Sequence, residues 1–395
     1  MEQKRIYLDN CVTTKPDPQI FEVMKEYWEN EYWFPATFFT AGEEINSKLD
    51  NFKATLGKTI NAKPDEIHFT RGGTSANNIA IKGILMANSQ KGTHIICSVV
   101  DYPDILTNYA FFEKSGFTVT YLQPDEDGVV SAQKLKDAIR PDTILFSTTW
   151  VNHVVGTIQP VDEYAKVLQE ADHRVFLHVD AGQAYGKFPM DMNHTGIDTM
   201  SVSAHKIHGP QGVGFLYKRT KTPLAQVVHG VNRVDNLETG GMNIGSLAGF
   251  AKAAELTFAD LAATTKKLRD SSNYLLERIM NEIPDVELNG AAGEGRACHN
   301  INVSIDYIEG EAMGMMLDLN GVTAATGSAC ASQGLKPSYV LMAMGRNHMQ
   351  SHGSMKFTVS KFTTKEELDF TVDKLKEIVI ELRRRSPLYQ EKKDK

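Results

Sequence analysis

Short apolar runs alternate with longer amphipathic stretches through the first half of the chain. Five runs rich in β-branched and aromatic residues are typical of strands: residues 93–100, 143–150, 174–180, 198–204 and 212–218. Apolar residues recur at helical spacing between several of these runs, as in residues 131–139 and 160–172. Strands that are apolar on both faces and are separated by helices predict a mostly parallel sheet covered on both sides. We therefore expect an α/β fold.

The pattern changes near residue 250. Residues 247–283 form one long helical run that could bridge to a second domain. The rest of the chain predicts two strands, a closing amphipathic helix and a frayed charged tail, over residues 298–306, 354–360, 364–385 and 390–395. We predict a large domain of residues 15–258 and a smaller α+β domain that combines residues 1–14 and 259–395.

Composition and charge limit the class of protein. A chain of 395 residues, 42% of them hydrophobic, has enough material for two domains around a shared cleft. The formal net charge of −7 argues against a general nucleic-acid binder, which needs a basic surface to neutralise phosphates. No stretch reaches the roughly 18 apolar residues of a membrane-spanning helix, and the N-terminus has no apolar signal core. The sequence predicts a soluble cytoplasmic protein whose partners are small molecules or proteins, without nucleic acid or membrane.

The four cysteines are Cys11, Cys97, Cys298 and Cys330. They are too few and too scattered for a disulfide framework, and no Cys-x-x-Cys pair suggests a structural zinc. We expect no metal, and any cysteine chemistry would be that of a free thiol. From composition alone, a lone cysteine is more often a small buried apolar residue than a nucleophile.

Polar residues follow several of the strand patterns, where open α/β sheets bind their ligands. A Gly-Gly-Thr turn at residues 72–74 opens a helical segment whose free N–H groups suit a phosphate, although such a turn is more often only a turn. Asp180 ends one strand pattern, where a carboxylate can pair with a cationic ring nitrogen or simply cap a helix. Ser203, His205 and Lys206 end the next pattern, and the ordinary alternative for Lys206 is an exposed lysine.

Together these features match the three attachments that pyridoxal phosphate requires: a phosphate cup, a carboxylate for the pyridinium nitrogen and a lysine for a Schiff base. Their order and spacing resemble the class V aminotransferase family of pyridoxal-phosphate enzymes, and closely the cysteine desulfurases. The resemblance runs nearly end to end, over IYLDNCVTT, GGTSANNIAIKG, VNHVVGTIQP, HVDAGQAYGK, SAHKIHGPQGVGFLY, GSACAS and LKPSYVLMAMG. It implies fold type I, with a large domain on a mostly parallel sheet and a smaller α+β C-terminal domain.

The resemblance assigns cofactor roles residue by residue. It makes Lys206 the Schiff-base lysine and later proton shuttle, Asp180 the partner of the ring nitrogen, and Gln183 a hydrogen-bond partner of the phenolic oxygen. It places Tyr102 where a residue stacks on the ring and His153 near the ring oxygen. The expected phosphate ligands are Gly73, Thr74, Ser203 and His205. Ser246 stands where the family has a threonine donated by the second subunit, which implies a homodimer with shared active sites.

The resemblance also assigns the substrate side of the reaction. Cys330 matches the thiol that attacks the sulfur of the substrate cysteine, leaving a persulfide on the enzyme and releasing alanine. Asn152 and Lys356 are the expected substrate-binding residues. Such an enzyme passes its sulfur to a protein acceptor, for example an iron–sulfur scaffold.

Several residues depart from the family pattern. Tyr102 replaces a histidine that, in the family, stacks on the ring and assists proton transfers, so it is an expected catalytic residue although its phenol is a poorer base at neutral pH. His153 replaces an asparagine. Lys356 replaces an arginine and offers a point charge instead of a planar fork. Asn243 also replaces an arginine, and Cys11 replaces an alanine. Because arginines around the substrate are lost at Lys356 and Asn243 while the main cofactor residues and the Cys330 thiol are kept, we expect a changed or relaxed substrate preference.

Two enzymatic hypotheses and one binding hypothesis follow. The first is a pyridoxal-phosphate-dependent cysteine desulfurase that acts through a Cys330 persulfide in sulfur transfer. The alternative is a C–S or C–Se lyase that acts on another β-substituted amino acid, for which Cys330→Ala leaves substantial turnover. The third, a weakened enzyme that serves mainly as a binding partner, is disfavoured because a scaffold needs neither Lys206 nor Asp180.

Overall fold

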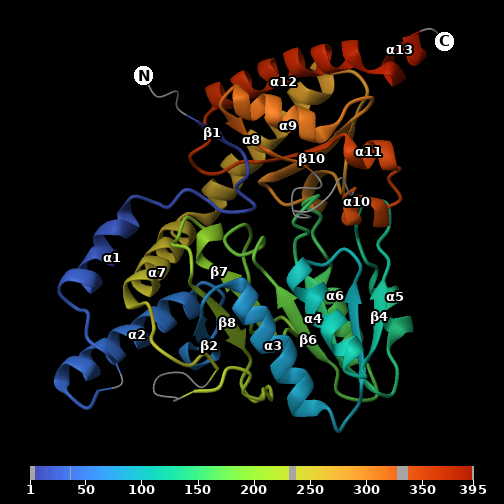
Figure 1. Ribbon diagram of the computed structural model, residues 1–395. Helices are drawn as coiled ribbons and strands as arrows, with labels where there is room; N and C mark the ends of the chain where they lie inside the picture. The colour runs from blue at the N-terminus through green and yellow to red at the C-terminus, as the bar shows by residue number, and fades with distance from the viewer. Residues whose placement is uncertain (1–4, 36, 231–236, 327–336, 394–395) are drawn as a thin grey trace.

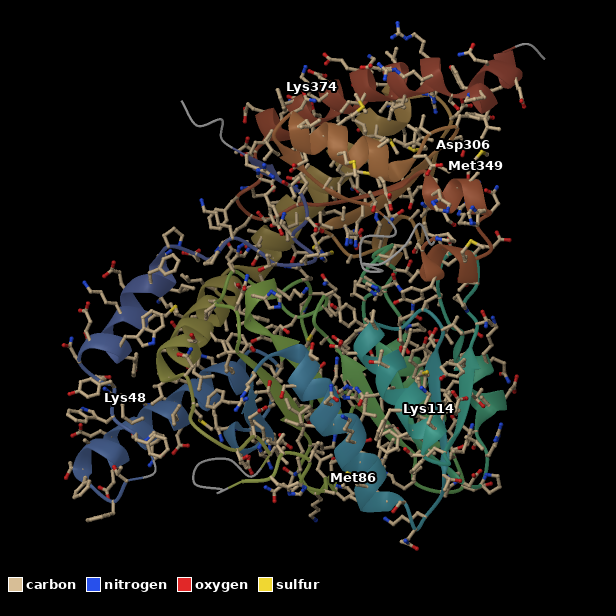
Figure 2. The ribbon with its side chains drawn as sticks, viewed as in Figure 1. Lys48, Met86, Lys114, Asp306, Met349 and Lys374 are labelled. Atoms are coloured by element: carbon tan, nitrogen blue, oxygen red, sulfur yellow. The ribbon has the colours of Figure 1, made fainter. Side chains whose placement is uncertain are left out.

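A computed structural model describes residues 5–35, 37–230, 237–326 and 337–393 (Figure 1). A large body built on one wide sheet carries a smaller layer of helices and a second sheet above it. Figure 2 labels charged side chains in both parts of the molecule, among them Lys114 in the large part and Lys374 in the smaller one. In the part of the chain that the structure describes, no helix combines the length and the apolar character needed to cross a bilayer.

The wide sheet has seven strands in the order β2-β8-β7-β6-β5-β3-β4. Neighbouring strands are parallel from β7 through β4, whereas β8 runs antiparallel to both β7 and β2. The strands are β2 (Ile67–Thr70), β3 (His94–Ser98), β4 (Thr118–Leu122), β5 (Thr143–Thr149), β6 (Phe176–Asp180), β7 (Thr199–Ser203) and β8 (Gly214–Lys218). All five strands predicted in this region are present, and the predicted α/β class with a mostly parallel sheet is confirmed.

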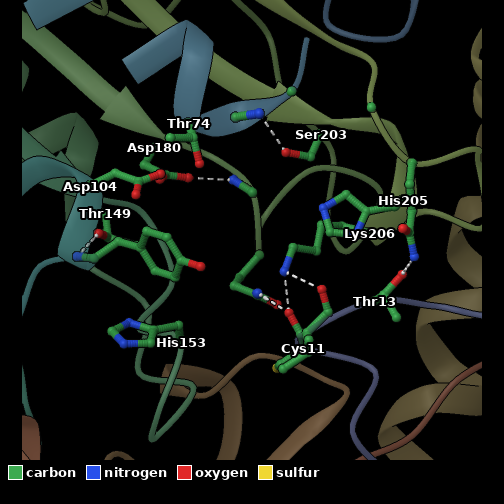
Figure 3. Close-up of a pocket in the computed structure, with 18 of the residues that line it drawn as sticks. Cys11, Thr13, Thr74, Asp104, Thr149, His153, Asp180, Ser203, His205 and Lys206 are labelled. Atoms are coloured by element: carbon green, nitrogen blue, oxygen red, sulfur yellow. Dashed lines mark hydrogen bonds between the residues drawn. The ribbon is translucent and has the colours of Figure 1, made fainter. Parts of the chain in front are cut away.

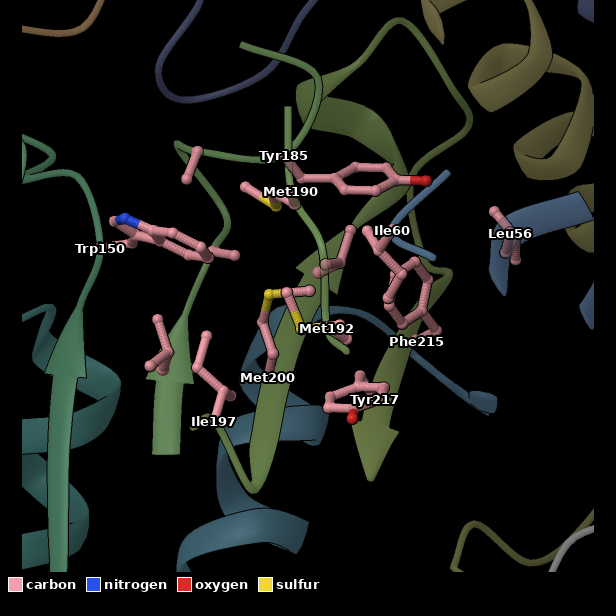
Figure 4. Packing of buried hydrophobic residues seen from close by; sticks show 14 of the residues in the cluster. Leu56, Ile60, Trp150, Tyr185, Met190, Met192, Ile197, Met200, Phe215 and Tyr217 are labelled. Atoms are coloured by element: carbon pink, nitrogen blue, oxygen red, sulfur yellow. The ribbon is translucent and has the colours of Figure 1, made fainter. Parts of the chain in front are cut away.

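Helices cover both faces of this sheet. Along β3, Ile96 faces one apolar cluster and its neighbours Ile95 and Cys97 face another, as the two-residue period of a strand requires. The second cluster contains side chains of α3 (Gly73–Asn88) and α4 (Pro103–Lys114). The first contains side chains of α1 (Gln19–Glu29), α2 (Thr40–Lys58), α6 (Val161–Gln169) and α7 (Ile244–Phe258). Figure 4 shows its centre, where Tyr185 packs edge-on against Phe215.

The smaller part of the molecule has a four-stranded antiparallel sheet in the order β12-β13-β10-β9. Its strands are β9 (Val286–Leu288), β10 (Asn300–Ile305), β12 (Ala325–Thr326) and β13 (Ser354–Thr358). Its apolar cluster contains side chains of α8 (Leu261–Glu282), α9 (Gly310–Leu319) and α12 (Lys365–Arg385). The N-terminal strand β1 (Ile6–Tyr7) pairs in parallel with β11 (Val322–Thr323), so the first residues lie with the C-terminal part. The exact division into domains stays a prediction.

Three local expectations were wrong or incomplete. The helical run predicted over residues 247–283 is two helices, α7 and α8, because Asp260 accepts a hydrogen bond from the amide of Ala263 and so caps a new helix. The tail predicted to fray instead forms α13 (Pro387–Lys393) through residue 393. Strand β4 was missed because most of its side chains are only half-buried and the sequence lacks a long apolar run there.

Candidate active site

A cavity of about 630 Å³ lies where β6 and β7 end, and both parts of the molecule contribute to its wall (Figure 3). The large sheet supplies Asp180, Ser203, His205 and Lys206, and α3 begins at the same place. Lys356 enters from β13 of the smaller sheet. The other lining residues used below are Cys11, Val12, Gly73, Thr74, Tyr102, His153 and Gln183. The tertiary structure thus brings together most of the residues predicted for the site.

The turn before α3 forms a cradle at one end of the cavity. Gly72 has a φ of 129°, and α3 has no side-chain cap, so its first amides face the cavity end with the positive end of the helix dipole. The amide of Gly73 donates a hydrogen bond of 2.8 Å to Oγ of Ser203. Thr74 and His205 line the same end. Burial and the nearby charge of Lys206 lower the pKa of His205 to about 4, so its imidazole is neutral at physiological pH.

Asp180 lies at the end of β6 with both carboxylate oxygens held. Asn77 donates to Oδ2 and the amide of Gly182 donates to Oδ1, each at 2.8 Å. The carbonyl oxygen of the Asn77 side chain is fixed in turn by Ser201 at 2.6 Å and His178 at 2.9 Å. Burial raises the pKa of Asp180, so a cationic group placed against this carboxylate would stabilise its ionised form.

Asn77 and His178 were not singled out from the sequence. Asn77 lies one turn after Gly73 on the face of α3 that meets the sheet, and its amide is fully buried. A buried asparagine on an otherwise apolar helix face is the signal that would have indicated it.

Lys206 ends a single turn of 3-10 helix that follows β7. Its Nζ donates hydrogen bonds to the backbone carbonyls of Cys11 and Val12, the latter at 2.8 Å. Burial lowers the pKa of Lys206, which increases the share of neutral amine available for attack on a carbonyl carbon. The carbonyl of Cys11 also accepts a second hydrogen bond. The side-chain amide of Gln183 donates it, at 2.8 Å.

Tyr102 and His153 form one side wall of the cavity. Their rings meet edge to face, with centroids 4.9 Å apart and planes at 80°. The backbone amide of Tyr102 is fixed by Oγ1 of Thr149 at 2.9 Å. Burial, together with the charges of Lys356 and Lys206, lowers the pKa of His153 to about 3, so this imidazole is also neutral.

Lys356 is the cation that the smaller sheet contributes to the cavity wall. Its Nζ lies 3.7 Å from Oδ1 of Asp9, and both side chains are largely buried. Asp9 lies just after β1, in a position that the sequence did not single out. Burial raises the pKa of Asp9, while the charge of Lys356 opposes that shift.

Asn152 is placed differently from its predicted role. Its side-chain amide donates to the carbonyl of Val100 at 2.9 Å, and its Oδ1 accepts from the amides of Val154 and Val155. It is buried and is absent from the cavity wall in the described part of the chain. These contacts shape the loop that presents His153, so the predicted contact between Asn152 and substrate gains no support.

The cysteines divide into two groups. Cys330 lies outside the described residues. The thiol of Cys11 contacts Nε2 of His299 at 3.6 Å and the amide of Asn300 at 3.4 Å, and burial raises its pKa. Cys11 therefore packs as a neutral thiol, and Cys97 and Cys298 are also buried and free. No group of His, Cys, Asp and Glu side chains suited to a metal ion occurs among the residues that the structure describes.

Ser246 and Asn243 lie at the start of α7, away from the cavity wall of their own chain. Oδ1 of Asn243 accepts a hydrogen bond of 3.1 Å from the amide of Ser246 and so caps the helix. The structure thus gives Asn243 a local structural role. The predicted contribution of Ser246 to a second subunit stays a prediction.

Fold and site together match one known family. The pattern described as Aminotransferase class-V matches residues 6–370. Cysteine desulfurase IscS of Dictyoglomus turgidum is 40% identical over 98% of each chain. The protein of the same name from Methanosarcina thermophila is 37% identical over 98% of this chain and 95% of its own. The chain therefore belongs to the class-V aminotransferase family, in its cysteine desulfurase branch.

Solved structures agree with this assignment. A NifS-like protein superposes with a TM-score of 0.90 at 28% identity, over 96% of this chain and 100% of its own. The structure described as SspA in complex with cysteine superposes with a TM-score of 0.80 at 27% identity, over 91% and 100% of the two chains. The structural similarity includes both sheets, so the smaller C-terminal part of the chain has the same fold as in these structures.

Proposed function

We propose that this protein is a pyridoxal-phosphate-dependent cysteine desulfurase. It removes sulfur from L-cysteine as a persulfide on Cys330, releases alanine and passes the sulfur to a protein acceptor. The observation that carries the proposal is the convergence of Lys206, Asp180 and the turn at Gly73 on one cavity. The names of the curated relatives support the same activity.

The residues present fit the cofactor. The cradle before α3 leaves no room for a side chain at Gly73, since a Cβ there would lie 2.7 Å from Oγ of Ser203. The bare backbone can therefore approach a bound phosphate closely. Thr74, Ser203 and His205 would hold the phosphate there. Asp180 is a buried carboxylate that already accepts two hydrogen bonds. The pyridinium nitrogen would supply the cation that stabilises its ionised form. When bound, the cofactor supplies an electron sink for bonds at the substrate Cα.

Lys206 performs the proton transfers in this proposal. Its burial favours the neutral amine, which takes a proton at Nζ. The carbonyl oxygens of Cys11 and Val12 lie within hydrogen-bond distance and stabilise the resulting ammonium. Asp180, held by Asn77 and Gly182, keeps a proton on the ring nitrogen. Tyr102 covers the cavity side wall, where it excludes water from the reacting atoms.

Lys356 would bind the substrate carboxylate. It is the lining cation that enters from the smaller sheet, and Asp9 balances its charge until substrate arrives. A single ammonium group orients a carboxylate less strictly than an arginine fork does. This favours a tolerant site within the desulfurase reaction.

The sulfur-transfer step is balanced without an external oxidant. The thiolate of Cys330 attacks the sulfur of the substrate, the C–S bond breaks, and the Cα–Cβ fragment leaves as alanine after protonation. The products are one alanine and one cysteine persulfide per L-cysteine. A later thiol acceptor takes the outer sulfur and restores the Cys330 thiol.

A homodimer is part of the proposal. Ser246 is absent from the cavity of its own chain, as expected of a residue that contributes to a partner's phosphate site. A group of exposed aromatic side chains near α1 and the start of α2 offers apolar surface for such an interface: Phe21, Trp28, Tyr32, Trp33, Phe34, Phe38 and Phe39. The cytoplasmic location predicted from the sequence also belongs to this proposal.

The decisive experiment compares the wild type with Cys330→Ala in the presence of L-cysteine and a reductant. We expect alanine and sulfide from the wild type and neither from the variant. Cys97→Ala is the matched control, because Cys97 is fully buried in β3 and should leave alanine formation unchanged. Pyruvate in place of alanine, or continued turnover by Cys330→Ala, would instead identify a lyase acting on β-substituted amino acids.

A further inference from the structure

A buried carboxylate joins the ends of two neighbouring strands beside the cavity. Asp101 follows β3 and is 2% exposed. Its Oδ2 accepts a hydrogen bond of 2.7 Å from the amide of Ser98, the last residue of β3. Its Oδ1 accepts one of 2.7 Å from the amide of Thr149, the last residue of β5, and one of 3.3 Å from the hydroxyl of Thr148. One side chain thus holds both strand ends at the edge of the sheet.

The same carboxylate fixes the residue that follows it. The amide of Tyr102 donates a hydrogen bond of 2.9 Å to Oγ1 of Thr149 (Figure 3), and the amide of Thr149 donates to Asp101. These three residues therefore close a small ring of hydrogen bonds. Thr149 is also the partner of Asp180 in the pairing of β5 with β6, and Tyr102, Thr149 and Asp180 all line the cavity. The position of Tyr102 is thus tied through Thr149 to that of Asp180.

Two further hydrogen bonds hold the backbone of this loop. The carbonyl of Asp101 accepts one of 2.7 Å from the hydroxyl of Tyr339, the first residue of α10 (Tyr339–Ala343). The carbonyl of Val100 accepts one of 2.9 Å from the side-chain amide of Asn152. Because both acceptors are backbone atoms, these contacts do not depend on the Asp101 side chain. The contribution of the carboxylate to the position of Tyr102 can therefore be tested separately from the fold of the loop.

The Asp101 carboxylate accepts both amide hydrogen bonds fully only when it is ionised. A proton on one oxygen makes that oxygen a donor and weakens its bond to the facing amide. Burial raises the pKa of Asp101 from 3.8 to about 7, and no cation pairs with it among the described residues. The titratable side chains that its charge reaches are Cys97 of β3, Tyr109 of α4 and Tyr164 of α6. Each of these stays neutral, because burial raises its pKa as well.

We propose that the ionised carboxylate of Asp101 is a positioning residue that holds Tyr102 on the cavity wall in register with Asp180, and so keeps the cavity shaped for pyridoxal phosphate. The proposal rests on the desulfurase function above. Asp101 is absent from the cavity wall in the described part of the chain. It therefore acts through Thr149 and Tyr102 and makes no contact with the bound molecule.

Asp101→Asn tests the charge. The substitution keeps the size of the side chain but sets an N–H donor against one of the two amides. At about pH 8 we expect the dissociation constant of pyridoxal phosphate, from fluorescence titration of the apoenzyme, to rise about tenfold. A second readout needs no cofactor: the Tyr102 amide of the apoenzyme should exchange with deuterium several-fold faster, as followed by peptide mass.

Asp198→Asn is the matched control. The buried carboxylate of Asp198 also accepts a backbone amide, that of Leu177 in β6 at 2.9 Å, but it does not line the cavity. This variant should lower thermal stability while the dissociation constant of pyridoxal phosphate stays within about twofold of wild type. An equal loss of affinity in both variants would assign the effect to general destabilisation and overturn the inference.

A double-mutant cycle with Tyr102→Ala decides whether Asp101 acts through Tyr102. We expect Asp101→Asn to add less than about twofold to the dissociation constant of the Tyr102→Ala protein. Losses of binding free energy that add in full would show a merely structural role and overturn the inference. Thr149→Val tests the same link without touching the buried carboxylate, because it removes the acceptor of the Tyr102 amide. It should weaken binding as Asp101→Asn does, whereas Thr149→Ser keeps the hydroxyl and should bind like the wild type.

The effect of Asp101→Asn should also depend on pH. Above about pH 7 the wild-type carboxylate is ionised, and below it the carboxyl group is as neutral as the asparagine. The ratio of the dissociation constant of the variant to that of the wild type should therefore fall from about tenfold at about pH 8 towards one at about pH 6. A ratio independent of pH, or an unchanged exchange rate of the Tyr102 amide, overturns the inference. Failure of the wild-type apoenzyme to bind pyridoxal phosphate would instead defeat the proposed function, while the exchange rates would still decide the positioning role.

Discussion

The side-chain amide of Asn77 donates a hydrogen bond of 2.8 Å to Oδ2 of Asp180, in the interior of the part built on the seven-stranded sheet. Asn77 cannot turn its amide over at low cost, because Ser201 and His178 both bond to its carbonyl oxygen. The donor therefore points permanently at the carboxylate. Since a hydrogen bond to the charged form favours ionisation, this contact opposes the effect of burial on the pKa of Asp180.

Asn77→Ala should weaken cofactor binding. Without the amide, the pKa of Asp180 rises further and the carboxylate pairs less well with a pyridinium nitrogen. We expect the dissociation constant of pyridoxal phosphate to increase about tenfold, the effect of one hydrogen bond to a charged group. Fluorescence titration of the apoenzyme measures it. Asn88→Ala is the control on the same helix, because its buried side-chain amide donates to the carbonyl of Ile84 and accepts from Lys91, and neither contact involves Asp180. An equal loss in both variants would contradict the role of Asn77.

Lys356 should control affinity for the substrate carboxylate. Removing a charge-assisted hydrogen bond in Lys356→Ala is expected to raise KM for L-cysteine at least tenfold, or about 1.5–3 kcal/mol. Lys356→Arg should retain or improve binding, because the guanidinium can engage both carboxylate oxygens. Steady-state kinetics of alanine formation separate KM from kcat. Lys361→Ala is the control. It removes an ion pair with Asp17, which does not line the cavity, so KM should not change.

Gly73 should be intolerant of a side chain. In Gly73→Ala the new Cβ meets Oγ of Ser203 at 2.7 Å, so either the turn or the serine must move out of the cradle. We expect phosphate-dependent affinity for the cofactor to fall about tenfold, since the Ser203 hydroxyl would turn out of the cradle and lose its hydrogen bond with the amide of Gly73. Gly241→Ala is the comparison, because no atom of the described residues lies within 4 Å of its Cβ position. Identical cofactor titrations for the two variants would show that the cradle does not hold the phosphate.

Acid should destabilise the fold in part through His94. This side chain is fully buried between Thr143 and Thr120, and burial lowers its pKa from 6.5 to about 4. Below its ordinary pKa the unfolded chain binds a proton that the folded chain excludes. The free energy of unfolding therefore falls as the pH drops from 6.5 towards 4, by up to about 1.4 kcal/mol per pH unit.

His94→Gln removes this contribution while keeping polar atoms near both threonines. Urea unfolding at about pH 7 and about pH 5 should show a shallower loss of stability in the variant than in the wild type. The comparison uses the slope against pH and not the stability itself, because the substitution also changes packing. Parallel slopes would assign the acid sensitivity to other buried histidines, such as His178 and His208.

Much of the large sheet could be predicted because its central strands are buried on both faces. Strands β3, β5, β6, β7 and β8 are buried along almost their whole length and are rich in apolar and β-branched residues, and the helices between them have a regular apolar period. The break between α7 and α8 was missed because helix propensity continues through it. Only the local cap at Asp260 ends one helix and starts the next.

The candidate site divides in the same way. Lys206, Asp180 and the turn at Gly73 follow strand ends or open a helix, so their convergence could be expected from the sheet. The role of Asn152 could not be predicted from the sequence, because its side-chain nitrogen and oxygen both form hydrogen bonds with the neighbouring backbone. Asp9 was not anticipated either, since its position depends on the pairing of the first strand with β11.

By itself, the sequence determined the fold class and the family, and it pointed to the residues that we propose hold the cofactor, because each depends on local patterns or on short motifs. The tertiary structure alone decided which groups face one another across the chain. It set Asp9 against Lys356, the carbonyls of Cys11 and Val12 against Lys206, and Tyr339 against Asp101 and His153. These contacts join segments far apart in sequence, and their geometry follows from the packing of the two sheets against the N-terminal segment and α10.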